Sequence, residues 1–143
     1  MKAMTLFFLT LIFSVNMFGQ SSKPQVDGSW KIKSIFESGK MIDMMAKETI
    51  VEISVKDKNI LIYVGCNRIT SKFEFITSDM IKPLQLVTTR KSCQSTITEL
   101  ESSVRYVLEQ VNSVRKSGAR VEFFKDTNLL MVIERPTDVK KKK

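Results

Sequence analysis

One run of residues in this chain carries apolar side chains at the helical period, and it lies among segments that alternate like β-strands. Its apolar positions are Ile97, Leu100, Val104, Val107, Leu108, Val111 and Val114. Thr96 and Glu99 have the spacing of a capping box, and Gly118 stands where a helix would end. Valine is a poor helix former, so we expect this helix to depend on packing against a sheet.

The other segments predict strands. We expect them at residues 28–36, 49–55, 60–64, 72–76, 80–86, 120–125 and 128–134. Short polar turns join them as hairpins, and Pro83 places its strand at a sheet edge or a bulge. The methionine-rich residues 41–47 predict a helical turn or a loop. The sequence therefore predicts a β-rich α+β fold, with an antiparallel curved or barrel-like sheet of about seven strands and one long amphipathic helix packed on it.

Residues 1–20 have the pattern of a secretory signal peptide, with Lys2 followed by an apolar run and then by Gly19 and Gln20. An uncleaved membrane anchor is the alternative, but the run is shorter than the ~20 apolar residues of a spanning helix. No cysteine lies near the cleavage site to carry a lipid. We therefore expect an exported protein, periplasmic or secreted, that is not a lipoprotein and has no membrane span after cleavage.

The net charge of +8 is concentrated at the end of the chain, where residues 140–143 are all lysine. This run predicts a disordered basic tail at residues 137–143, after a single domain at 21–136. The domain lacks the interleaved aromatic and arginine residues of a nucleic-acid face, so no nucleic-acid partner is expected.

The chain has two cysteines, Cys66 and Cys93. An even number in an exported chain favours a disulfide, because such bonds persist outside the cytoplasm. Two buried free thiols are the alternative.

The sequence contains no histidine, which removes the commonest general base and the usual serine and cysteine triads. Two cysteines alone cannot build a structural zinc site, and no glycine-rich phosphate loop is present. We therefore predict a protein that is not an enzyme, with no catalytic residue, metal or cofactor.

Two short motifs stand out: Gly-Cys-Asn at 65–67, and Thr-Thr-Arg at 88–90 followed by Cys93. Together with the opening Gly-Ser-Trp at 28–30, they resemble the META domain family, which includes bacterial HslJ-like heat-shock proteins. The resemblance covers most of the chain after residue 28, with one departure at Ser71, where members usually have glycine. The matching residues are Gly28, Trp30, Gly65, Cys66, Asn67, Thr88, Thr89, Arg90 and Cys93.

The resemblance implies a barrel-like antiparallel sheet with one packed helix, in an envelope protein linked in some members to heat stress or antibiotic tolerance. It supplies no catalytic mechanism and no ligand. We therefore predict a monomeric, stress-related protein that binds or stabilises an envelope component, with an unknown envelope protein or small ligand as its partner. The alternative is a carrier that holds a small apolar ligand inside the barrel.

Overall fold

The computed structural model describes residues 25–45 and 47–137; the expected signal peptide and nearly all of the expected basic tail lie outside these ranges. The described chain forms nine strands and one helix. They are β1 (Gly28–Glu37), β2 (Lys40–Asp43), β3 (Ile50–Ser54), β4 (Asn59–Tyr63), β5 (Arg68–Phe75), β6 (Ile81–Thr88), α1 (Ser95–Gln110), β7 (Ser113–Ser117), β8 (Arg120–Lys125) and β9 (Asn128–Glu134).

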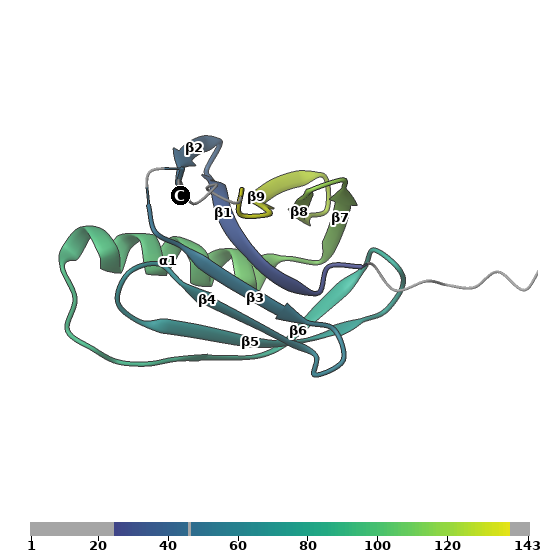
Figure 1. The fold of residues 1–143 in the computed structure, drawn as a ribbon, viewed down its shortest axis with the longest axis horizontal. Helices are drawn as coiled ribbons and strands as arrows, with labels where there is room; N and C mark the ends of the chain where they lie inside the picture. Colours follow the sequence, from purple (N-terminus) through teal and green to yellow (C-terminus); the bar gives the residue numbers. More distant parts are fainter. Residues whose placement is uncertain (1–24, 46, 138–143) are drawn as a thin grey trace, which may run out of the picture.

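The strands form a single antiparallel sheet in the order β6-β5-β4-β3-β1-β9-β8-β7, with β2 paired to β1. The sheet is strongly curved, and α1 packs against β6, β5 and β1. In Figure 1, β7, β8 and β9 lie above the C-terminal end of the helix. The predicted β-rich architecture, with one helix packed on a curved antiparallel sheet, is thus confirmed.

The long strand β1 joins the two halves of the sheet. On one edge, its residues 28–30 pair with β3 and its residues 34–37 pair with β2. Between these two segments, the Ile32 N–H donates instead to Thr49 Oγ1 at 2.9 Å, so a buried side chain replaces the missing ladder bond. On its other edge, β1 pairs with β9 across a bulge at residues 32–34, which bends the strand.

The two outer strands of the sheet, β6 and β7, meet at one end only. There the Ile81 N–H donates to Asn112 O at 3.0 Å, and the Val114 N–H donates to Asp79 O at 2.7 Å. Elsewhere the helix lies between the two halves of the sheet and buries Val104, Val107 and Leu108 in the core. The result is an open barrel whose gap is covered by α1, so the helix depends on the sheet as expected.

The helix is shorter than predicted and ends at Gln110. Val111 and Val114 are buried, as the apolar stripe requires, but Val114 belongs to β7. The chain leaves the helix because the Asn112 side chain exchanges two hydrogen bonds of 2.8 Å with Asp126 in the β8–β9 turn. The predicted C-terminal stop at Gly118 is therefore wrong; this glycine lies in the β7–β8 turn instead.

The predicted capping box is also wrong, because the N-cap is Gln94 and its side chain makes no capping bond. Instead, the Gln94 backbone carbonyl accepts hydrogen bonds from the Ile97 and Thr98 N–H groups. Ile97 and Leu100 are only half-buried, so the first turns of the helix contribute less to the core than the stripe suggested.

Two strands were not predicted from the sequence, β2 and β7. The methionine-rich segment forms β2 by pairing Met41 with Phe36 of β1, and the neighbouring Met44 is buried in the core. The prediction for Pro83 is confirmed, since β6 is an outer strand and has a bulge next to this proline, where the pairing with β5 skips Leu84.

Candidate functional site

Two of the family motifs meet at Asn67, which lies in the loop between β4 and β5 and is 6% exposed. Its side-chain oxygen accepts hydrogen bonds from Thr89 Oγ1 at 2.9 Å and from the Lys91 N–H at 2.8 Å. The Thr89 hydroxyl in turn accepts a hydrogen bond from the Arg68 N–H at 3.0 Å. One buried amide therefore ties the β4–β5 loop to the segment that leads from β6 into the helix.

Glu101 completes this arrangement from the second turn of α1. Its carboxylate accepts hydrogen bonds from the Asn67 backbone N–H and, at 2.9 Å, from the Asn67 side-chain amide. The side chain is 5% exposed, so its charge depends on these donors for stabilisation. We call the group of Asn67, Thr89, Lys91 and Glu101 the Asn67 clamp.

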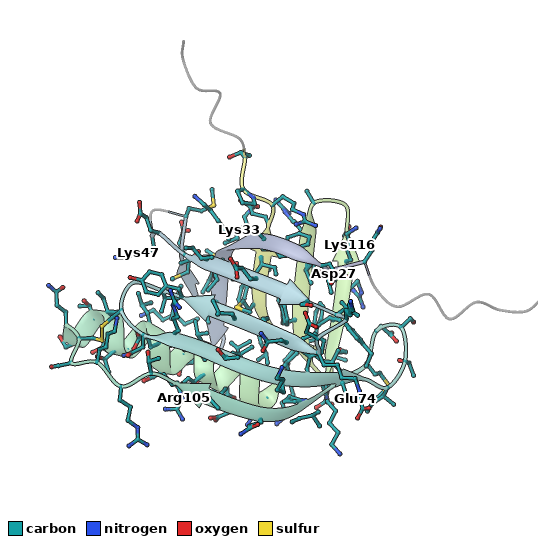
Figure 2. All side chains as sticks on the ribbon, turned by 60° about the horizontal axis from the view of Figure 1, so that its bottom comes forward. Asp27, Lys33, Lys47, Glu74, Arg105 and Lys116 are labelled. Atoms are coloured by element: carbon teal, nitrogen blue, oxygen red, sulfur yellow. A yellow bond between two sulfur atoms is a disulfide. The ribbon has the colours of Figure 1, made fainter. Side chains whose placement is uncertain are left out.

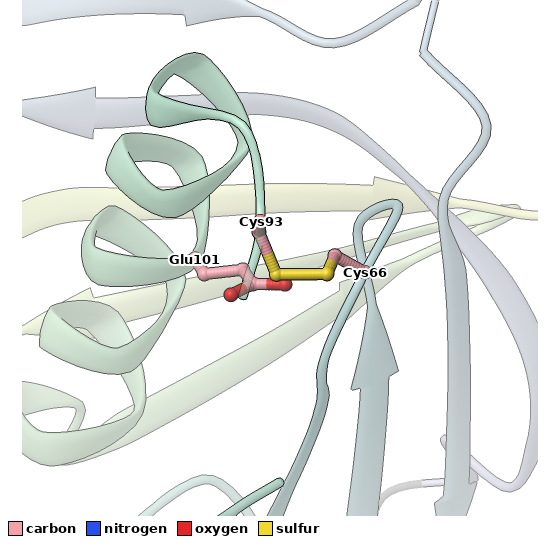
Figure 3. Close-up of side chains that lie close together, drawn as sticks. All are labelled: Cys66, Cys93 and Glu101. Carbon is pink, nitrogen blue, oxygen red and sulfur yellow. A yellow bond between two sulfur atoms is a disulfide. The ribbon is translucent and has the colours of Figure 1, made fainter. Parts of the chain in front are cut away.

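The predicted disulfide is present and lies against the clamp. Cys66 precedes Asn67, and Cys93 comes directly before the helix N-cap, with their Cα atoms 6.2 Å apart. Figure 3 shows the Glu101 carboxylate beside the sulfur–sulfur bond, and Asn67 Nδ2 lies 3.1 Å from Cys93 Sγ. The bond and the clamp thus join the same two segments.

The first motif, at Gly28 and Trp30, forms a second structural contact far from the clamp. The Arg135 guanidinium lies 3.8 Å from the centroid of the buried Trp30 ring and donates hydrogen bonds to the carbonyls of Asp27 and Ser29. Gly28 has φ +107°, and a Cβ there would lie 2.7 Å from Arg135 Nη1. The positive φ favours glycine here, and a Cβ would push the Arg135 guanidinium aside.

The remaining motif residues do not join the clamp through their side chains. Gly65 has φ +125°, which makes the turn before Cys66, and its carbonyl accepts a hydrogen bond from the Tyr63 hydroxyl at 2.8 Å. The Thr88 hydroxyl is buried and unpaired within the described residues, and Arg90 is exposed. Ser71, the departure from the family pattern, is buried in β5.

Glu101 was not predicted from the sequence, because its apolar neighbours dominate the helical pattern. It lies at helical spacing from Ile97, Val104 and Leu108, so the signal was a carboxylate on an otherwise apolar stripe. Each of its bonds to Asn67 is structural, and both partners are neutral donors. The arrangement holds backbone segments in place and presents no activated nucleophile.

The interior of the open barrel is filled by side chains. Its cavity has a volume of about 20 Å³ and is lined mostly by apolar residues, among them Ile60, Phe73, Leu108 and Phe123. Pockets for small molecules measure ~300–1,000 Å³, whereas this cavity has room for about one water molecule. This packing weighs against the carrier hypothesis.

The outer face of the sheet has a shallow open depression next to the disulfide. It is lined by Ile50, Glu52, Leu61, Tyr63, Cys66, Arg68, Thr89 and Lys91, and we call it the outer depression. Ile50 is 48% exposed, and Ile50, Tyr63 and Arg68 form one cross-strand row. The depression therefore joins apolar side chains to two cations.

Other charged side chains are distributed around the molecule. Lys47, Glu74, Arg105 and Lys116 come from different elements and lie around its periphery (Figure 2). The ion pairs in the described part of the chain are exposed or half-exposed, as for Lys58 with Glu74 at 3.5 Å, so they add little stability.

Comparison with known proteins agrees with this architecture. No curated protein matches the sequence. The solved NMR structure of a protein from Burkholderia xenovorans superposes with a TM-score of 0.61 at 16% identity, covering 78% of this chain and 83% of the other. At that identity, the likeness shows a shared fold alone. The model of the META domain family matches residues 23–136, which include the clamp, both cysteines and the Trp30 contact, and the chain therefore belongs to the META domain family.

Proposed function

We propose that this META-domain protein is exported and acts without catalysis, by binding or stabilising a protein component of the envelope under stress. The N-terminal signal pattern and the disulfide support export. No helix in the described ranges is long and apolar enough to cross a bilayer. The stress role rests on the resemblance to HslJ-like members of the family.

One observation supports the binding role: the motif side chains are engaged in internal hydrogen bonds, whereas apolar side chains are exposed on the outer face of the sheet. The side chains of Asn67, Thr89 and Glu101 are used in holding the fold, and the interior has no room for a ligand. Apolar side chains remain accessible outside, in the outer depression. An exposed apolar face with a polar rim is typical of a protein-binding surface.

Ile50 is the residue to change, because it is exposed, faces outward from β3 and makes no side-chain hydrogen bond. Ile50→Asp introduces a charge into the outer depression. Ile76→Asp is the matched control, since Ile76 is 60% exposed and lies beyond the opposite end of β5. Both variants are expected to keep the fold.

The test is cross-linked capture from the organism's own envelope fraction with the wild type and both variants. We expect a partner that the wild type and Ile76→Asp recover and that Ile50→Asp loses. Equal recovery by all three would exclude the outer depression as the binding face. Reproducible turnover in a broad hydrolase screen, by the wild type and by both variants, would contradict the non-enzymatic proposal as a whole.

A further inference from the structure

We propose that reduction of the Cys66–Cys93 disulfide creates a zinc site made of the two thiolates and the Glu101 carboxylate. The inference is independent of the envelope role, and it concerns a state of the same chain in which the bond is open. It rests on how closely the three ligand atoms already lie and on what holds them there.

The three side chains are grouped tightly. One ligand atom from each of Cys66, Cys93 and Glu101 lies within 4.8 Å of the other two. In a tetrahedral site with Zn–S bonds of ~2.3 Å, the two sulfurs would lie roughly 3.8 Å apart. Opening the disulfide therefore needs only a small outward movement of each sulfur to reach that geometry, and Figure 3 shows the carboxylate beside them.

The Asn67 clamp keeps the two cysteines close without the covalent bond. Asn67 follows Cys66 directly, and its side chain is bonded to Thr89, to Lys91 and to Glu101 of the helix that begins after Cys93. These hydrogen bonds span the same two segments as the disulfide. Reduction therefore leaves a preformed dithiol with a carboxylate at its side.

The surroundings favour the charged ligands. Asn67 Nδ2 lies 3.1 Å from Cys93 Sγ and donates to Glu101 Oε2 at 2.9 Å, so one amide orients two of the three ligands. Cys93 also stands at the N-terminus of α1, where the helix dipole stabilises a thiolate. Arg68 and Lys91 line the depression that reaches Cys66, and their charge offsets the net negative charge of two thiolates and one carboxylate around Zn²⁺.

The ion has a path to the site. Both cysteines are half-exposed, and Cys66 lines the outer depression, which is open to solvent. Glu101 supplies the buried side of the site. A water molecule from the depression would complete a four-coordinate set with one exchangeable position.

The reaction balances with a dithiol as the reductant. The dithiol transfers two electrons and two protons to the Cys66–Cys93 bond and is itself oxidised to a disulfide. Zn²⁺ then replaces the two thiol protons and forms two Zn–S bonds, while the Glu101 carboxylate contributes the third ligand. Two protons are released for each ion bound.

The test uses the mature chain, reduced with a phosphine and desalted without oxygen, and titrated with Zn²⁺ against a chromophoric chelator. We expect one ion per reduced chain, two protons released per ion, and no stoichiometric binding to the oxidised chain. Co²⁺ in place of Zn²⁺ should give the absorption spectrum of a tetrahedral site with thiolate ligands. A reduced, folded chain that binds no zinc would overturn the proposal.

Variants separate the three ligands. Cys66→Ser should abolish stoichiometric binding. Glu101→Gln should weaken it at least ~10-fold, because even outer-shell partners of metal ligands contribute 10–100-fold. Glu99→Gln, an exposed glutamate on the same helix, is the control and should change nothing. Zinc affinity equal to the wild type in Glu101→Gln would remove Glu101 from the site and overturn the three-ligand proposal.

Circular dichroism decides the outcome for a reduced chain that unfolds. If the reduced chain unfolds and zinc restores the native spectrum, binding is coupled to folding and the proposal holds. If zinc leaves such a chain unfolded, the proposal fails.

Discussion

The buried carboxylate of Glu101 accepts two hydrogen bonds from Asn67, one from the backbone N–H and one, at 2.9 Å, from the side-chain amide. The two residues come from the β4–β5 loop and from α1, and they lie 34 positions apart in the sequence. Through this pair, the family's Gly-Cys-Asn segment is joined directly to the helix that covers the gap in the sheet.

Glu101→Gln should lower the free energy of unfolding by ~1.5–3 kcal/mol, the usual range for hydrogen bonds to a charged group. The glutamine oxygen can accept one bond from Asn67, but its amide nitrogen then faces the second donor. Urea unfolding followed by circular dichroism measures the change. Glu99→Gln should stay within ~0.5 kcal/mol of the wild type, because Glu99 is exposed. Equal loss in both variants would mean that the clamp adds no specific stability.

Opening the disulfide should cost about 3–4 kcal/mol in the chain-entropy model, since the bond joins residues 27 positions apart. The comparison is between the oxidised and the reduced chain in metal-free urea titrations. Because the Asn67 clamp holds the same segments, we expect the reduced chain to keep a cooperative transition at a lower midpoint. An unchanged midpoint would show that the bond contributes nothing to stability.

Leu108→Ala should cost ~2–5 kcal/mol, because Leu108 is 2% exposed and packs from α1 into the core. Leu84→Ala, at an outer strand position that is 52% exposed, serves as the control and should change little. Leu100→Lys should cost less than Leu108→Ala, since the half-buried Leu100 position lets a lysine extend its amine to water. A Leu108→Ala chain with the wild-type midpoint would place this helix face outside the core.

Gly28→Ala should destabilise the fold more than Gly39→Ala. Both glycines have positive φ, +107° and +78°, so each alanine pays a backbone strain of ~1 kcal/mol. At Gly39 a Cβ has nothing within 4 Å, whereas at Gly28 it meets Arg135 Nη1 at 2.7 Å and displaces the guanidinium from Trp30. Thermal unfolding of the two variants gives the difference, and an equal decrease in Tm would argue against a role for the Arg135 contact.

Export has a direct test. The mature N-terminus should fall between Gly19 and Ser22, where small and polar residues follow the apolar run. N-terminal sequencing of the protein recovered from outside the cytoplasm gives the cleavage bond. A mature chain that still begins at Met1 would contradict the signal peptide.

The sequence predicted those parts of the fold in which local pattern and tertiary packing agree. The alternation in β1 and β3 and the apolar stripe of α1 required only that each element bury one face. The end of α1 could not be predicted, because Val114 continues the helical period while the hydrogen bonds of Asn112 to Asp126 direct the chain into β7. That contact joins residues 14 positions apart, and the hydrophobic periodicity around the helix end does not indicate it.

The clamp shows a similar division. The motif residues Asn67 and Thr89 were singled out from the sequence, and the pairing of Cys66 with Cys93 followed from their number. The role of Glu101 was not predicted, because the sequence of an apolar helix face does not show which residue a single charged side chain on it will contact. Only the fold brings its carboxylate to an asparagine on another element.

The pairing of β1 with β9 has a consequence for how the chain is made. These are the first and last strands of the described chain, yet they lie side by side in the middle of the sheet. A nascent chain that stops short of residue 128 carries two unpaired inner edges, on β1 and on β8, with Trp30 lacking the cover of Arg135. The ribosome must therefore complete β9 before the central ladder can form, and until then those edges are open to pairing with other unfinished chains.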